Sequence, residues 1–518
     1  MFGNNNNDNQ AYRIFVKDGT MKDKVIYLLI LVISTSLMIT GDNKYIHLNS
    51  YKSIIIDQIN RKTKCKAIVG DDFYQYYYDY LISKDELDDI DRLKTLNIDK
   101  LKLVWEDHED SKENIKKVYR LISHLNISKL KCVHSCSGLP MNITSMSFDY
   151  SFDERLVSGC LPPNLKTLKF GRYFDQRIKS GVLPNTLIKL IFNESFNQTI
   201  EQGVLPSSLK VLKFKESNFQ QDIKVGTFPP NLEVLEFSGK CSALEDGALP
   251  QTLRILAYAP TSWLPQIKTL PNLKILTISY ASEAFHMDLN CLPVSLTRLE
   301  IFSNIKLINV MPPTIRYLNL EHCDYDFNGV FKDRSIYQLD FLRLNPKQVV
   351  SLDGMKIKEL ELNMRTYMSF VGKEVDIPFG VETLSIQYAS KFQKEIPSSV
   401  KKLVFSKEIH CIDDLQKRYD MTGSASIQEL IIICDEISFS HRISVYIPPI
   451  IFPPKTLIEL PDILNEKIWI RMIDNQHYLV FSQSPIITSI VHVSQLYQYI
   501  IYIIDKYQKL KYQSYKGF

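Results

Sequence analysis

The chain has 518 residues, which is too long for one ordinary compact domain, so several domains or an array of repeats are expected. Hydrophobic residues make up 45% and charged residues 23%, so most of the chain is expected to fold, and a net charge of +4 gives no sign of a nucleic-acid-binding protein. The nine cysteines are dispersed and odd in number, which indicates buried thiols in a reducing compartment rather than a disulfide framework.

The N-terminal part divides into two segments. Residues 1–20 contain an asparagine tract, Asn4 to Asn7, and are predicted to be disordered. Residues 21–88 are predicted to form a helical region that includes an uncharged apolar run at 25–40. This run is shorter than the ~20 residues of a membrane-spanning helix, so a buried core helix in a cytoplasmic protein is favoured. A signal peptide or membrane anchor, with a membrane or secretory location, is the alternative.

A repeat follows, after imperfect entry coils over residues 89–138. Leu-Pro or Phe-Pro pairs begin at Leu139, Leu161, Leu183, Leu205, Phe228 and Leu249, at intervals of 22, 22, 22, 23 and 21 residues. Leu270, Leu292, Met311, Ile377 and Ile396 continue the series. Because so few residues cannot bury a core alone, neighbouring coils must stack. We therefore predict a mainly β solenoid over residues 139–465, with one parallel strand in each coil of about 22 residues.

Each coil carries apolar residues at fixed offsets. The spacing Leu-x-x-Leu-x-Phe predicts a strand with one buried face, and the polar residue after a second Phe predicts a ladder of side chains that satisfies turn backbone groups. In the later, degenerate part, the apolar triplets Ile336/Leu339/Phe341 and Ile357/Leu360/Leu362 are assigned to the buried face. The structural repeat positions of the clearest coils are Leu161, Leu165, Leu168, Phe170, Leu183, Leu187, Leu190, Phe192, Phe196, Asn197, Gln198, Leu205, Leu209, Leu212 and Phe214.

The end of the chain is predicted to cap the array. Residues 466–518 are expected to form an α/β cap, with a strand pair at 468–481 and an amphipathic helix at 491–512. Solenoids need such atypical ends because an open apolar end aggregates.

Two groups of residues are candidates for metal sites. Cys132, His134 and Cys136 alternate, with Cys160 about one period later, but a structural zinc site needs four ligands and small buried thiols are the favoured interpretation. The segment 324–329 (DYDFNG) resembles the opening of an EF-hand loop, but Ser335 stands where that loop needs a glutamate, so a repeat turn is favoured. We expect no catalytic residue, metal or cofactor.

The repeat residues resemble the FNIP repeat, a leucine-rich-repeat-like unit. The best matches are the segments 196–200 (FNQTI) with 203–206 (GVLP), and 174–176 (FDQ) with 181–184 (GVLP). The resemblance implies a leucine-rich-repeat-like solenoid, and no catalytic residues are transferred by it.

The residues between the strand leucines are expected to face outward on the sheet. They change from basic to acidic along the array: Thr167, Lys169, Lys189, Ile191, Val211 and Lys213, then Val234, Glu236, Arg298, Glu300, Gln338, Asp340, Glu359 and Glu361. A charge pattern of this kind steers a partner, although it also simply keeps a long sheet soluble. We expect a monomeric, non-enzymatic scaffold for a protein partner, with no nucleic acid bound. A membrane-anchored or secreted recognition protein is the alternative.

The lysines of the early coils give the first test. Reversing the charge of Lys169, Lys189 and Lys213 together is expected to reduce recovery of a partner by affinity purification without unfolding the chain, because surface charges steer association. Unchanged recovery of the partner would show that these lysines do not bind it.

Overall fold

The computed structural model shows two compact units, Met1–Leu253 and Arg254–Phe518, each described here by itself. The residues that the structure describes are 45–48, 65–70, 98–104, 116, 119–120, 123–124, 127–239, 243–280, 285–346, 351–364, 375–387, 396–406, 426–433, 453–460, 466–482, 487–496, 498–500 and 502–504. The asparagine tract, the apolar run at 25–40 and most of the predicted N-terminal helical region lie outside them.

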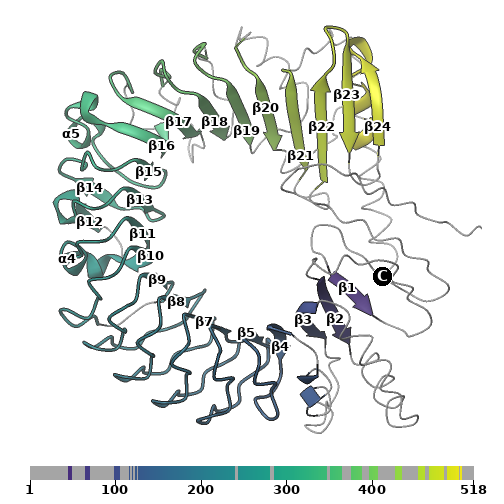
Figure 1. The fold of residues 1–518 in the computed structure, drawn as a ribbon. Helices are drawn as coiled ribbons and strands as arrows, with labels where there is room; N and C mark the ends of the chain where they lie inside the picture. Colours follow the sequence, from purple (N-terminus) through teal and green to yellow (C-terminus); the bar gives the residue numbers. More distant parts are fainter. Residues whose placement is uncertain are drawn as a thin grey trace, which may run out of the picture. The chain divides into compact units, whose positions relative to one another are not determined.

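The first unit is a parallel sheet in which each strand pairs with the next one along the chain (Figure 1). Its strands are β1 (Tyr45–Leu48), β2 (Cys65–Gly70), β3 (Ile98–Val104), β4 (Lys129–Val133), β5 (Ser145–Phe148), β6 (Thr167–Lys169), β7 (Lys189–Phe192), β8 (Val211–Phe214) and β9 (Val234–Phe237). From β5 onward the in-register partners are 22 or 23 residues apart, so the predicted parallel solenoid is confirmed.

Strands β1 and β2 lie within residues 21–88, which were predicted to be helical; the prediction is wrong at 45–48 and 65–70, and the rest of that range lies outside the described residues. Both segments are strands, and β2 pairs with β1 on one side and β3 on the other. The sequence of β2 (CKAIVG) contains adjacent β-branched residues, which favour the extended conformation.

Two columns of stacked phenylalanines fill the interior of the first unit. The first column contains Phe148, Phe170, Phe192, Phe214 and Phe237, with centroid separations of 5.2–5.5 Å between neighbouring rings. The second contains Phe152, Phe174, Phe196 and Phe219, at 5.9–6.2 Å. Within a coil the two columns touch, with 3.9 Å between the rings of Phe192 and Phe196. All nine side chains are buried, so each ring packs against its own coil and the neighbouring coils.

The corner and the turn of each coil follow from proline and glycine. At one corner the amide of Leu187 donates a hydrogen bond of 3.0 Å to the carbonyl oxygen of Pro184, and Leu209 repeats this contact with Pro206. Gly181 and Gly203, two residues before the Leu-Pro pair, both have φ of 78°, a conformation that favours glycine.

The predicted polar ladder is present. The carboxylate of Asp153 accepts a hydrogen bond of 2.9 Å from the amide of Asp175, whose own carboxylate accepts one of 2.8 Å from the amide of Asn197. The Asn197 side chain in turn accepts from the amide of Gln220 at 2.8 Å. Each polar side chain therefore satisfies a backbone donor of the next coil.

A second ladder of hydroxyl groups was not predicted. The hydroxyl groups of Thr186, Ser208 and Thr252 each donate to the carbonyl oxygen of a leucine in the preceding coil, at 2.7–2.9 Å. In the second unit, Ser295 donates in the same way to Leu273 at 2.7 Å. The sequence signal is the pattern Pro-x-Ser/Thr-Leu, because each hydroxyl residue directly precedes the first leucine of its triplet.

The second unit continues the parallel arrangement up to β21 and then changes to antiparallel pairing. The parallel strands are β10 (Ile255–Pro260), β11 (Ile275–Tyr280), β13 (Arg298–Ile301), β15 (Tyr317–Asn319), β16 (Gln338–Leu344), β17 (Lys356–Asn363), β18 (Thr383–Gln387), β19 (Lys402–Ser406), β20 (Glu429–Ile433) and β21 (Lys455–Leu460). Antiparallel strands β22 (Glu466–Met472), β23 (His477–Ser482) and β24 (Ile487–His492) follow.

Small elements lie on the connections of the second unit. A separate pair of parallel strands joins β12 (His286–Asp288) to β14 (Lys306–Ile308). The short helices are η1 (Thr261–Trp263), α4 (Leu264–Ile267), η2 (Leu289–Cys291), α5 (Phe327–Val330) and η3 (Arg334–Ile336).

The assignment of one apolar triplet was wrong. The buried residues of β16 are Leu339, Leu342 and Leu344, whereas Ile336 is 44% exposed and Phe341 is half-buried. Both choices have the same spacing, so periodicity alone did not separate them. Pairing with β15 decides the register, because Leu342 lies opposite Leu318. Phe341 and Arg343, opposite Tyr317 and Asn319, therefore occupy the outward positions that had been assigned to Gln338 and Asp340. The second triplet, at 357, 360 and 362, is buried as predicted.

The C-terminal end contains the predicted strand pair, β22 and β23, and their pairing is antiparallel. Strand β24 was not predicted, and it occupies the first two residues of the helix predicted over 491–512. Residues 493–496, 498–500 and 502–504 are helical. Leu496, Ile500, Ile503 and Ile504 are buried at the spacing of one helix face, so this segment covers the apolar interior at the end of the sheet.

The phenylalanine columns make a direct stability prediction. Replacing Phe192 by alanine is expected to lower the free energy of unfolding by about 3–5 kcal/mol, because the cavity opens between three coils. Chemical denaturation measures this change. The matched control is Val157→Ala, at a residue that is 61% exposed, which should change stability by less than about 0.5 kcal/mol. Equal effects of the two substitutions would contradict the packing described.

Candidate functional site

The predicted partner-binding lysines lie on one sheet face of the first unit but not in one row. Lys169 lies opposite Ile191, which lies opposite Lys213, whereas Lys189 lies opposite Thr167 and Val211 in a neighbouring row. Lys169 and Lys213 are thus two strands apart, roughly 10 Å. The ammonium group of Lys213 forms an ion pair with the carboxylate of Glu236 on the next strand. The face carries charge, but one of its three cations is already paired.

Charged residues on the strands of the second unit also pair with one another. Arg298 Nε lies 2.6 Å from Glu300 Oε1, and the Arg298 guanidinium lies 3.6 Å from the ring centroid of Tyr317. Arg343 contacts Glu361 at 2.6 Å and a second carboxylate, that of Glu321, at 3.1 Å. These strands therefore present charges that are largely satisfied within the protein.

The histidine and the cysteines that were considered as zinc ligands contact different partners. His134 Nε2 lies 3.2 Å from Asp149 Oδ1. Burial raises the pKa of Asp149, but hydrogen bonds from His134 and Ser151 outweigh it and hold that pKa below its usual range. The thiol of Cys136 hydrogen-bonds that of Cys160, which raises the pKa of Cys136 and lowers that of Cys160 to about 7. The two cysteines are thus neighbours, while within the described part of the chain no group of three or more His, Cys, Asp or Glu residues is arranged to hold a metal ion.

The segment at 324–329 forms a turn and a short helix. Asp324 pairs with Lys306 in an isolated parallel bridge. The carboxylate of Asp326 caps α5 by accepting from the amides of Asn328 and Gly329, at 3.3 and 3.1 Å. Its oxygens are therefore used by the backbone, as in the favoured interpretation of a turn.

A row of outward apolar side chains crosses five neighbouring strands at the C-terminal end of the second unit. On these strands the alternate residues, such as Ile432, Ile458 and Ile470, are buried and form the core. On the opposite face every one of these strands carries an apolar side chain in the same row of the register. We call this set the apolar row; it consists of Val404, Ile431, Leu457, Trp469 and Phe481.

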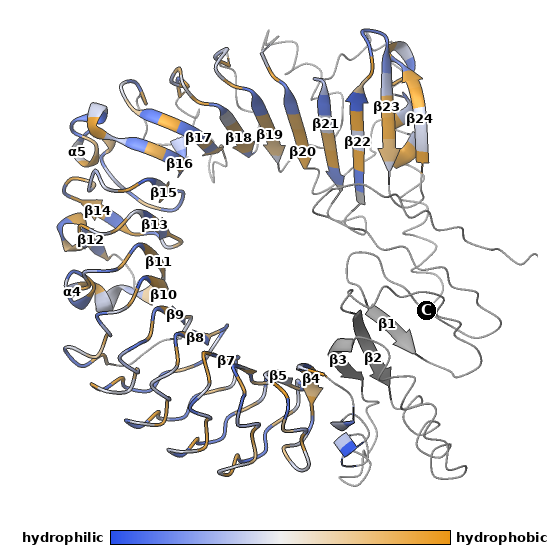
Figure 2. Ribbon diagram, in the orientation of Figure 1, coloured by the Kyte–Doolittle hydropathy of each residue, from blue (hydrophilic) through white to orange (hydrophobic). Residues whose placement is uncertain are grey.

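The apolar row is only partly covered. Its first four members are half-buried and Phe481 is 37% exposed. The rings of Trp469 and Phe481 lie 5.3 Å apart between centroids. Ile490, 67% exposed on β24, extends the apolar surface beyond Leu479. Figure 2 shows that β20, which contributes Ile431, is hydrophobic along most of its length. Apolar area that remains exposed over several strands is typical of interaction sites.

Two cations border the apolar row on one side. Lys455 and Arg471 lie directly opposite each other on the antiparallel strands β21 and β22, and both are exposed. Glu429 is the neighbour of Lys455 on β20, but its carboxylate lies 3.4 Å from the ammonium group of Lys402. Like charges in direct register on neighbouring strands repel each other.

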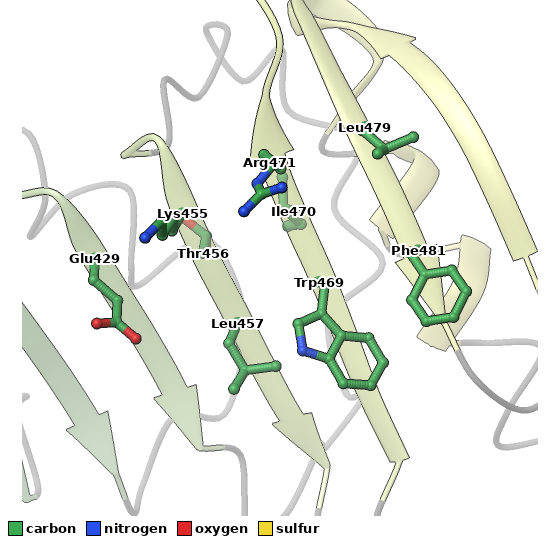
Figure 3. Close-up of a pocket in the computed structure, with 9 residues that line it drawn as sticks. All are labelled: Glu429, Lys455, Thr456, Leu457, Trp469, Ile470, Arg471, Leu479 and Phe481. Atoms are coloured by element: carbon green, nitrogen blue, oxygen red, sulfur yellow. The ribbon is translucent and has the colours of Figure 1, made fainter. Parts of the chain in front are cut away.

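A shallow cavity of about 380 Å³ opens at this place. It is lined by Glu429, Lys455, Thr456, Leu457, Trp469, Ile470, Arg471, Leu479 and Phe481 (Figure 3). In Figure 3, Leu457, Trp469 and Phe481 lie on consecutive strands, with the ends of Lys455 and Arg471 above them. The cavity is therefore lined by apolar side chains, two of them aromatic, and bordered by two cations.

A larger cavity of about 560 Å³ in the first unit has a different character. It lies between two coils, and its lining includes Thr199, Gln220, Gln221 and Asp222. The Thr199 hydroxyl donates to the side chain of Gln221 at 3.0 Å, and Gln220 belongs to the polar ladder. Because these groups already bond one another, the cavity offers less to a ligand than the apolar row.

Sequence reasoning missed the apolar row. In the sequence of β23 (HYLVFS), both alternating sets contain large apolar residues, and Tyr478 and Val480 are the buried set. Two features of the sequence therefore indicate the apolar row. Strand β23 is apolar on both faces, and β22 carries a tryptophan and an arginine two residues apart.

A comparison with protein-family models identifies the repeats within residues 137–257. The family model described as FNIP Repeat matches residues 137–173, 152–195, 196–240 and 219–257. These residues form the coils with the phenylalanine columns, so the chain contains FNIP repeats over this part of its length. No curated protein matches the chain. One similar solved structure is described as CroV588, a novel circular LRR protein; its identity is 18% and its TM-score 0.35, over 82% of this chain and 73% of that one.

The apolar run at 25–40 lies outside the described residues, and the structure does not test its two interpretations. Across the ranges given above, no helix has the length and apolar character that crossing a membrane requires.

Because Lys455 and Arg471 lie opposite each other, we predict that reversing one of these charges stabilises the protein. Arg471→Glu places a carboxylate opposite Lys455, so the free energy of unfolding is expected to rise by about 0.2–1 kcal/mol, and less at high salt. Chemical denaturation at two salt concentrations measures this. Arg471→Gln, which removes the repulsion without adding attraction, should give a smaller increase. A loss of stability in Arg471→Glu would show that the two side chains do not repel each other.

Proposed function

We propose that the chain is a non-enzymatic scaffold that binds another protein through the outward sheet face of its second unit, centred on the apolar row. The observation that carries this proposal is the continuous register of five apolar side chains over β19 to β23, on the face opposite the core. A solenoid gains nothing for its own core from these positions.

The composition of this surface supports a protein partner. Tryptophan, tyrosine and arginine are the residues that most often carry the binding energy of protein interfaces. Here Trp469 lies beside Phe481 and two residues from Arg471, on regular strands that hold their positions. Burying about 100 Å² of the apolar surface contributes on the order of 2.5 kcal/mol before the losses of association.

The alternative lysine face is a weaker candidate on the same criteria. Lys213 is paired with Glu236. Between the lysines lie Thr167, Ile191 and Val211, none of them aromatic, and Ile191 is buried rather than exposed as predicted. Charges at the margin of an interface mainly change the rate of association. We therefore assign the first unit a steering role at most.

Site-specific photocrosslinking tests the scaffold proposal. A photoreactive phenylalanine analogue at position 481 is expected to crosslink a second protein in cells that produce the chain. The same analogue at Val294, which is 86% exposed in the same unit, should not. Leu457→Asp should abolish the crosslink at 481, because it places a charge in the middle of the row.

Two results would contradict the proposal. One is equal crosslinking from positions 481 and 294, and the other is a crosslink at 481 that Leu457→Asp leaves unchanged. A melting curve of Leu457→Asp that matches the parent chain is required, to show that this outward residue does not affect folding.

A further inference from the structure

We infer that the segment bound on the apolar row is an extended, acidic peptide of another protein, with a carboxylate next to a large apolar side chain. This inference rests on the proposed function and names the chemistry of its partner.

The charges along the two margins of the apolar row differ. On one margin the residues are Lys402, Glu429, Lys455 and Arg471, three cations and one carboxylate, and that carboxylate contacts Lys402. On the other margin Glu459 and Lys467 neutralise each other, with 2.9 Å between Nζ and Oε1. The excess positive charge therefore lies on one side only, at Lys455 and Arg471.

An anion at this place relieves the repulsion between the two cations. Among the residues that the structure describes, no carboxylate forms an ion pair with Lys455 or Arg471. A carboxylate placed between an ammonium and a guanidinium group interacts favourably with both, and the guanidinium offers paired donors to it. The partner thus supplies the negative charge that the sheet lacks.

An apolar side chain next to that carboxylate has a place to bind. Leu457, Trp469 and Phe481 follow one another across β21, β22 and β23 directly beside the two cations. Figure 3 shows the Trp469 ring between the other two side chains. A leucine or phenylalanine of the partner would lose its contact with water against this floor.

The length of the row sets the length of the bound segment. Five neighbouring strands at ~4.8 Å spacing extend over roughly 19 Å. An extended chain covers that distance in about six residues, at ~3.3 Å each. A short peptide is therefore sufficient to occupy the row.

Two other occupants fit the surface less well. A second copy that docked through the same face would add the same two cations, while the margin carboxylates Glu429 and Glu459 already pair with Lys402 and Lys467. Single-stranded nucleic acid also combines negative charge with stacking bases. However, the row is aliphatic over Val404, Ile431 and Leu457, and carboxylates stand on both margins, so successive phosphates would meet Glu429 or Glu459.

Fluorescence anisotropy with defined peptides and the full chain tests this inference. The probe is a labelled Ser-Asp-Phe-Asp-Leu-Asp-Gly-Ser peptide. Its comparisons replace every Asp by Asn, or every Asp by Lys, and a labelled eight-nucleotide single-stranded RNA is the fourth probe. We expect the acidic peptide to bind at least tenfold more tightly than the other three, with an advantage that shrinks at high salt.

Variants of the chain locate the effect. Lys455→Glu with Arg471→Glu is expected to reverse the preference toward the lysine peptide. Lys306→Glu with Lys356→Glu, which makes the same change of charge at two exposed lysines elsewhere in the unit, should leave the preference intact. Trp469→Ala should weaken binding of the acidic peptide severalfold without changing the sign of the preference.

Several outcomes overturn the inference: equal binding of the acidic and amide peptides, tighter binding of the RNA, no binding by any peptide, or dimerisation of the chain that Trp469→Ala abolishes. The crosslink at position 481 shows whether only the acidic-peptide inference is wrong or the scaffold proposal as well. A crosslinked protein segment without acidic residues would leave the scaffold function standing and refute its acidic partner. Absence of both the crosslink and peptide binding would refute both.

Discussion

Apolar contact between neighbouring coils holds the solenoid together. A coil of about 22 residues has one short strand and too few apolar side chains to enclose a core, so each coil uses the next as its cover. In the first unit the cover consists of the two phenylalanine columns, in which Phe192 touches rings ahead, behind and within its own coil. The polar and hydroxyl ladders satisfy the backbone groups that these contacts remove from water.

The stack also explains where a binding surface arises. Alternation along each strand sends one set of side chains into the core and the other to the outward face. On β13, β16 and β17 that outward set includes charges that pair within the protein, as at Arg298 with Glu300 and Arg343 with Glu361. At β19 to β23 it becomes apolar, with an unbalanced pair of cations beside it. The change from parallel to antiparallel pairing after β21 brings Trp469 and Arg471 into this place from the terminal cap.

Sequence reasoning predicted the solenoid because the Leu-Pro interval is a long-range signal that survives variation between coils. It failed around Leu339 and Phe341, where two sets of apolar residues have the same spacing. Only pairing with the neighbouring strand shows which of the two sets is buried. The apolar row escaped notice for a related reason: Ile431 and Phe481 look like core residues until the strand partners are known. Lys213 and Glu236 show the converse, since two residues 23 positions apart become an ion pair only through stacking.

Hydrogen exchange read by mass spectrometry on the full chain tests the stacking of the coils most directly. We expect the amides of residues 189–192 and 211–214 to exchange slowly and together, because each strand is hydrogen-bonded on both sides, whereas amides of the exposed turn around Gly203 should exchange fast. Fast exchange throughout both strand segments, at the rate of the turn, would contradict this stacking.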